Sequence, residues 1–180
     1  DDRGLDRGLR FPVFRLSAFQ DGGWILVEGP PGLQVPLEQE RAGATVARGG
    51  CTVDHTRRCT AWLRDAAAGP QDLRPGDTLL AFPEGAASAS LELVKLTAHI
   101  DPSGRDVTGQ APAGRPVDIA FSGLTGAAWP SNTRSATDPM GVYDYELNSS
   151  QWDLLLPGLV ADVFLEASSG HRNAARGLLE

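Results

Sequence analysis

The feature of this sequence that most constrains its fold is an internal repeat with a period of about 80 residues. At the start of the repeat the alignment pairs Leu16 with Leu96, Asp21 with Asp101, Val27 with Val107 and Gly29 with Gly109. After a slip of two residues it pairs Pro30 with Pro112, Val35 with Val117, Leu37 with Ile119, Pro75 with Pro157, Gly76 with Gly158 and Phe82 with Phe164. The matched classes are the ones that fix turns and the buried face of a strand. We therefore predict an arm at 1–10 followed by two copies of one module, at 11–94 and 95–180.

Each copy is patterned as short β-strands. Val117, Ile119 and Phe121 alternate with polar or small residues, which is typical of a half-buried strand. The 21 Gly and 13 Pro residues supply turns between such strands. Strands are expected at 14–19, 24–28, 33–37, 60–64, 78–82, 115–121, 142–148 and 159–167. The Ala-rich stretch 62–68 is the one candidate for a short helix. The pattern predicts an all-β chain with two tandem antiparallel β-sandwiches of about seven strands each.

The boundary between the copies lacks a flexible linker. Apolar residues continue from Leu91 through Leu96 to Ile100 without an intervening Gly, Pro or Ser. A Gly/Ser-rich spacer would allow bending, whereas strands that run almost directly into each other restrict it. We therefore expect the two modules to behave as a stiff rod.

The second copy contains an ordered series of turn and strand motifs. In order, they are Val107-Thr108-Gly109, Ala113-Gly114, Val117-Asp118-Ile119, Thr137-Asp138, Gly141, Tyr143, Tyr145, Leu156-Pro157-Gly158 and Gly170-His171. This series resembles the carboxypeptidase-regulatory-like and Ig-like β-sandwich modules of bacterial surface and secreted proteins. The resemblance covers most of 11–171, although the middle of the first copy departs from it. It implies Ig-like or prealbumin-like sandwiches that act outside the cell as spacers, stalks or adhesion modules and share no active site.

Composition excludes several function classes. The 16 basic and 23 acidic residues give a net charge of −7, which disfavours binding to a nucleic-acid backbone. No apolar run is long enough to insert into a membrane as a helix. No nucleophile–base pair, phosphate-binding glycine loop or cofactor motif is recognisable, so we predict no catalytic residues, no metal and no cofactor.

Two cysteines, Cys51 and Cys59, are the only ones in the chain. A disulfide that closes a small hairpin is the favoured interpretation for a secreted β-protein. Two alternatives remain open: free thiols, and a metal site in which His55 joins both cysteines at a spacing of four.

Trp129 is the candidate binding residue. It lies in a loop-like sequence, where an exposed aromatic ring stacks on a sugar or anchors a partner, and where a ring folded onto the protein is the alternative.

These observations predict a non-enzymatic, secreted or surface-displayed structural protein. Its role would be that of a rigid stalk, or of a filament subunit that docks onto other copies or onto other surface proteins through open strands or through the arm. The alternative is an accessory module that binds carbohydrate, such as a polysaccharide, or another cell-surface ligand.

Overall fold

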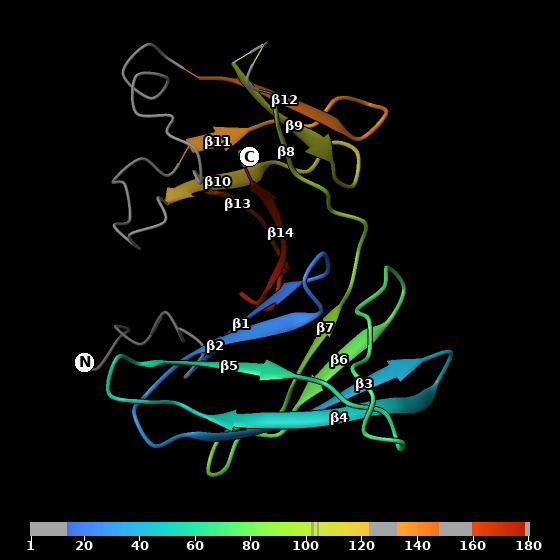
Figure 1. Cartoon of the computed structure of the whole chain (residues 1–180), viewed down its shortest axis with the longest axis vertical. Coiled ribbons are helices and arrows are strands. Elements are labelled where there is room, and N and C mark those ends of the chain that lie inside the picture. The colour runs from blue at the N-terminus through green and yellow to red at the C-terminus, as the bar shows by residue number, and fades with distance from the viewer. Residues whose placement is uncertain (1–13, 102, 104, 123–132, 148–159, 179–180) are drawn as a thin grey trace, which may run out of the picture.

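The computed structural model describes residues 14–101, 103, 105–122, 133–147 and 160–178, and it is all-β (Figure 1). The first seven strands are β1 (Arg15–Phe19), β2 (Trp24–Glu28), β3 (Gln34–Arg41), β4 (Ala44–Thr52), β5 (Arg58–Trp62), β6 (Thr78–Ala81) and β7 (Ala89–Glu92). The next seven are β8 (His99–Asp101), β9 (Asp106–Gln110), β10 (Val117–Ser122), β11 (Thr133–Ser135), β12 (Val142–Glu146), β13 (Val160–Glu166) and β14 (Arg172–Leu178).

The helix predicted near 62–68 is wrong. Trp62 ends strand β5, and the Asp65 side chain accepts hydrogen bonds from the amides of Ala67 and Gly69, both at 2.9 Å. An aspartate that bonds the backbone two and four residues ahead favours a turn over a helix. Ala68 accordingly has a φ of 63°. The described residues contain no helix, and therefore none that is long and apolar enough to cross a membrane.

The strand pairings of β1–β7 recur in β8–β14. In the first set, β1 pairs with β2, β2 with β5, β3 with β4 and with β6, and β6 with β7, all antiparallel. Adding seven to each strand number gives the antiparallel pairings of the second set. The division into modules at 94/95 itself stays a prediction.

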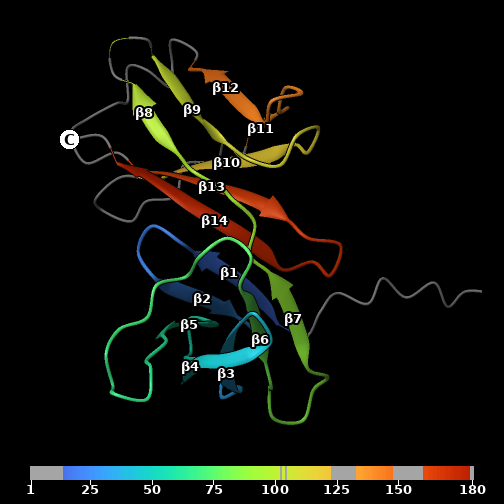
Figure 2. The ribbon, with the colours of Figure 1, turned by 90° about the vertical axis from the view of Figure 1, so that its right-hand side faces the viewer.

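One sheet runs across both sets of strands, and it corrects the expectation of purely antiparallel pairing. Strands β1 and β14 pair in parallel, with Ser17 opposite Arg172 and Phe19 opposite Ala174. This pairing produces a mixed seven-stranded sheet in the order β11-β10-β13-β14-β1-β2-β5. A four-stranded sheet (β4-β3-β6-β7) and a three-stranded sheet (β12-β9-β8) complete the fold. In Figures 1 and 2, β14 lies beside β1, where the colours change from red to blue.

Two clusters of buried apolar side chains form the interior. The first draws its fully buried members from positions 14–93, and the second from positions 96–175. Ala18 of the first cluster is in register with Asn173, which is in register with Leu165 of the second. Because side chains alternate between the two faces of a strand, both clusters lie on the same face of the seven-stranded sheet. We call the opposite face, which bears Ser17 and Phe19, the outer face.

The segment between β7 and β8 differs from the predicted direct continuation of strands. Strand β7 ends at Glu92 and β8 begins at His99, so residues 93–98 form a connector outside both strands. Leu93 and Leu96 in this connector are buried, which explains its strand-like apolar pattern. The backbone of the connector forms single hydrogen bonds outside the strand pairings: the Leu93 amide donates to the carbonyl of Asp77, and the Thr97 amide donates to that of Gln110.

Candidate functional site

The joint formed by the parallel pairing of β1 with β14 is the candidate functional element. It joins two strands whose residues are about 155 positions apart, as the hydrogen bond between Leu16 and His171 illustrates. Three side chains in and beside these strands, Gln20, His171 and Asn173, bond backbone groups across the joint.

Asn173 holds the connector against the seven-stranded sheet. It is 2% exposed, and its Oδ1 accepts hydrogen bonds from the Val94 amide at 3.1 Å and from Nε2 of Gln20 at 3.4 Å. Its Nδ2 donates to the carbonyl of Glu92 at 3.1 Å. Nε2 of Gln20 also donates to the Val94 carbonyl at 2.7 Å. Asn173 thus bonds backbone groups of Glu92, at the end of β7, and of Val94, in the connector, to β14.

His171 lies at the start of the joint and is buried in its neutral form. Its Nδ1 accepts a hydrogen bond from the Leu16 amide at 3.3 Å, so this nitrogen carries no proton. The ring packs against Phe14, with centroids 5.3 Å apart. Burial, and then the charge of Arg15, lower the pKa of His171 below its ordinary value.

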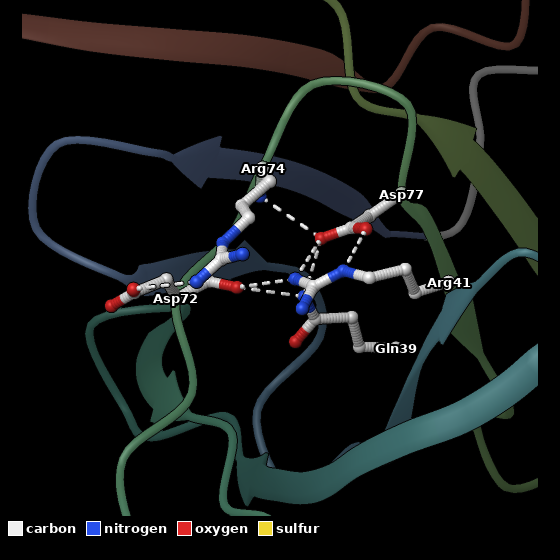
Figure 3. A network of polar contacts seen from close by, with 5 residues as sticks. All are labelled: Gln39, Arg41, Asp72, Arg74 and Asp77. Atoms are coloured by element: carbon white, nitrogen blue, oxygen red, sulfur yellow. Dashed lines mark hydrogen bonds and ion pairs between the residues drawn. The ribbon is translucent and has the colours of Figure 1, made fainter.

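A second buried polar network fixes the turn before β6 (Figure 3). Asp77 is 2% exposed and accepts two hydrogen bonds from Arg41, both at 2.8 Å. It also accepts bonds from Nε2 of Gln39 at 2.6 Å and from the amide of Arg74 at 3.0 Å. Burial alone raises the pKa of Asp77, but the bonds from Arg41, Gln39 and the Arg74 amide outweigh it, so the pKa lies below its usual value.

The two cysteines form a disulfide in the structure. Cys51 lies in β4 of the four-stranded sheet and Cys59 in β5 of the seven-stranded sheet, so the bond connects two sheets. Next to it, Arg48 and Arg64 exchange two backbone hydrogen bonds of 2.9 Å. Both sulfur atoms are bonded to each other and are therefore not thiolate metal ligands. Among the described residues, no group of three His, Cys, Asp or Glu side chains is placed to hold a metal ion.

The outer face carries an aromatic row, formed by Trp62, Trp24, Phe19 and Phe164. Trp62 is in register with Trp24, Trp24 with Phe19, and Phe19 with Ala174, which is in register with Phe164. Trp24 stacks on Phe19 with centroids 3.8 Å apart, and Phe164 meets Phe19 edge-on at 5.9 Å. Phe19 is 1% exposed and Trp62 is 57% exposed. The row therefore runs from a closely packed centre at the joint to an open ring at the β5 edge.

Arginines from β14 cover the packed part of this row. The Arg176 guanidinium lies 5.3 Å from the Phe19 ring centroid and 5.2 Å from that of Trp24, and it forms a bidentate ion pair with Asp162. The Arg176 amide also donates to the Asp21 carboxylate at 2.9 Å. Cation–π contacts of this kind favour close packing of the two halves of the sheet.

A hollow of about 530 Å³ opens beside the joint. Its lining includes Asn173, Val94, Arg115 and Arg134. Arg115 donates to the Glu166 carbonyl at 2.6 Å, and Arg134 pairs with Asp118 at 2.8 Å. Both cations are thus already bonded to other groups of the protein, and the lining contains no histidine or cysteine.

The structure treats the predicted site residues differently. Cys51 and Cys59 are joined, whereas Trp129 lies outside the described residues, as does the arm at 1–10. His55 is exposed and is not part of a metal site. Sequence reasoning missed Asn173, whose contacts depend on pairing across the joint. The alternation of side chains along β2 could have placed Trp24 on the outer face, because Ile25 and Val27 point to the buried face.

Comparison with known proteins gives remote structural likenesses. No protein-family model matches the sequence. No curated protein resembles it closely enough to count as a relative. A solved structure of a tetra-tandem repeat in the extending region of a large adhesion protein is 17% identical, covers 93% of this chain and 49% of its own, and has a TM-score of 0.34. The BSP domain of a biofilm-associated protein is 12% identical, with 93% and 29% coverage and a TM-score of 0.34.

A third likeness is to pullulanase from Anoxybacillus sp. LM18-11 in complex with maltotriose. It is 11% identical, covers 90% of this chain and 25% of its own, and has a TM-score of 0.30. The chain thus spans about half or less of the length of each of these three structures. All three TM-scores are below 0.5, so we draw no conclusion on the role of the chain from them.

Proposed function

We propose that this chain is a non-enzymatic structural protein of the cell surface or extracellular space, and that it acts as a stiff stalk. In this proposal residues 11–94 and 95–180 are two Ig-like or prealbumin-like β-sandwiches held end to end. The observation that carries the proposal is the parallel pairing of β1 with β14, which makes one sheet of strands from both halves. Bending at this joint would break backbone hydrogen bonds as well as side-chain contacts.

Two further features support a load-bearing role outside the cell. Asn173 ties the connector to the sheet, so the covalent link between the halves is also held by hydrogen bonds. The Cys51–Cys59 disulfide is typical of proteins that fold in an oxidising compartment.

Stiffness is tested by distance measurement across the joint. Spin labels at exposed positions Thr60 and Asp144 would report the distance between the two halves by pulsed electron resonance. We expect one narrow distribution in the wild-type chain and a broader one in Asn173→Ala. A broad distribution in the wild type would refute a stiff stalk.

The filament version of the proposal adds self-association. Copies of the chain would dock head to tail, and a contact that does not close on itself gives an open polymer. Sedimentation velocity and electron microscopy across a range of protein concentrations test this version. Monomers at the highest concentration would remove the filament while leaving the stalk intact.

Adhesion to a carbohydrate or another cell-surface ligand is the second candidate function. The specific observation in its favour is the 57% exposure of Trp62 at the open end of the aromatic row. Trp129 was the predicted contact for such a ligand, so Trp129→Ala and Trp62→Ala should be compared on an array of immobilised glycans. Equal binding by both variants and the wild type would argue against this candidate.

A further inference from the structure

Two arginines on the outer face each have a buried Nε atom without a hydrogen-bond partner among the described residues. These arginines are Arg15, in β1, and Arg172, in β14. Three other arginines on the same face are paired, as Arg58 with Glu28, Arg134 with Asp118 and Arg176 with Asp162. Buried donors without a partner are rare in folded proteins and call for an explanation.

The two arginines are neighbours across the joint. Ser17 is in register with Arg172, and Arg15 lies two residues earlier on β1 and on the same face. Their backbones are therefore separated by about 8 Å, from the spacing of strands and residues in a sheet. Burial, and then the charge of Arg15, lower the pKa of Arg172, while the charges of Glu166, Glu28 and Asp118 raise it. Glu28 also lies opposite Arg15 in the pairing of β1 with β2. The fold thus holds two like charges close together and partly removed from water, beside carboxylates that compensate them in part, and an anion between the two arginines would further reduce their mutual repulsion.

The aromatic row lies next to this cationic pair. The Arg172 guanidinium stands 5.1 Å from the centroid of Phe164, which is one end of the row. From Phe164 to Trp62 the row crosses four strand spacings, a length of about 19 Å. Trp62 offers an exposed ring at the far end, and such a ring stacks on flat apolar surfaces like those of pyranose sugars. A ligand that spans the face would contact the arginine pair at one end and the Trp62 ring at the other.

We propose that the outer face of the seven-stranded sheet binds an acidic polysaccharide rich in uronic acid residues. A sugar carboxylate would sit between Arg15 and Arg172, and a sugar ring would stack on Trp62. A carboxylate matches the planar fork of an arginine, and bonds from the outer N–H groups of the two guanidinium groups would offset their mutual repulsion. This inference rests on the proposed surface role, to which it adds a ligand class and a site.

Glu166 sets a limit on the affinity of the site. It lies opposite Arg172 in the pairing of β13 with β14, and it is exposed. Its charge attracts Arg172 and repels an incoming anion. Removal of this charge should therefore strengthen binding, whereas a purely structural role of Arg172 predicts no gain in binding from the Glu166→Gln variant.

The experiment measures binding of the full chain to polygalacturonate by calorimetry at low and high salt. We expect binding that weakens with salt, about a tenfold loss in Arg15→Gln and in Arg172→Gln, and about a fivefold loss in Trp62→Ala. Glu166→Gln should bind more tightly than the wild type. Arg57→Gln and Phe82→Ala are matched controls, because both residues are exposed and lie outside the aromatic row and the arginine pair. Both controls should bind like the wild type.

Several outcomes would overturn the inference. Equal binding to neutral dextran would show that charge is not recognised, and tighter binding to dextran sulfate than to polygalacturonate would assign the site to sulfate. Loss of self-association in Arg15→Gln, with no polysaccharide binding by the wild type, would make a second copy of the chain the occupant. Thermal melts of each variant separate these results from misfolding, and the spin-label distance separates them from failure of the stalk proposal.

Discussion

Replacement of Asn173 by alanine should loosen the joint and lower the stability of the chain. The substitution removes one acceptor of two hydrogen bonds and one donor, and it leaves the Val94 amide and the Glu92 carbonyl without these partners. At about 1 kcal/mol for each of the three bonds, the free energy of unfolding should fall by about 3 kcal/mol. Urea unfolding followed by tryptophan fluorescence measures this change.

Hydrogen exchange locates the effect of the same substitution. The Val94 amide should exchange faster in Asn173→Ala. Amides in β3 should exchange only as much faster as the loss of global stability requires. Gln34→Ala truncates an exposed amide side chain and serves as the control, with an expected change within about 0.5 kcal/mol. A double-mutant cycle with Gln20→Ala should reveal coupling, because Gln20 and Asn173 share a hydrogen bond.

Asn173→Asp distinguishes the role of the amide from that of side-chain volume. The aspartate retains an acceptor for the Val94 amide but places a carboxylate against the Glu92 carbonyl. It should therefore be at least as destabilising as alanine at neutral pH and should recover when the carboxylate is protonated. A loss below about 0.5 kcal/mol in Asn173→Ala, with unchanged exchange at Val94, would refute the role assigned to this residue.

Three further predictions concern the other buried polar groups. Because the pKa of His171 is lowered on folding, the unfolded chain takes up a proton first as the pH falls below about 6.5, and stability should drop by up to about 1.4 kcal/mol per pH unit. This pH dependence should shrink in His171→Gln. Asp77→Asn should cost about 3 kcal/mol at pH 7, because it leaves Arg41 without its ionic partner. The wild-type contribution of Asp77 is present above about pH 3.8 and is lost as the pH falls through its lower folded value, so the penalty of the variant should vanish in acid. Reduction of Cys51–Cys59 should lower the free energy of unfolding by about 2–3 kcal/mol.

Each of these measurements has a specific counter-result. If stability falls in acid as steeply in His171→Gln as in the wild type, His171 is not the group responsible for the pH dependence. A constant penalty of Asp77→Asn between pH 7 and pH 2 would show that the charge is irrelevant. Equal urea midpoints with and without reductant would mean that the disulfide does not constrain the unfolded chain.

Local strand patterns were predictable from the sequence, because alternation of buried and exposed side chains is a property of neighbouring residues. The stretch 24–28 was expected as a strand and is strand β2. Strand β4 was missed, since Gly49 and Gly50 and its mostly exposed side chains give it no apolar alternation. The recurring order of pairings agrees with the repeat, which was detected from turn residues and alternating apolar positions.

The joint could not be predicted from such patterns. The pairing of β1 with β14 brings together residues far apart in the chain, and no local property of Ser17 or Arg172 specifies a parallel neighbour. Asn173 lies in β14 and His171 directly precedes it, and their roles follow only from what lies across the joint. The connector at 93–98 was mistaken for a strand because burial, and not pairing, produced its apolar pattern.

Strand β5 lies at the edge of the seven-stranded sheet, and its links to β4 limit how copies of this chain could associate there. An open edge strand invites addition of another strand, and β5 is the last strand of the seven-stranded sheet. Beyond its end, however, Arg64 exchanges backbone hydrogen bonds with Arg48 of β4, and the Cys51–Cys59 disulfide joins β4 to β5 itself. A partner strand that paired along this whole edge would have to displace those bonds while the disulfide keeps β4 in place. Self-association at this end is therefore expected to use side-chain surfaces, and the exposed Trp62 ring is the largest apolar group that the β5 edge offers.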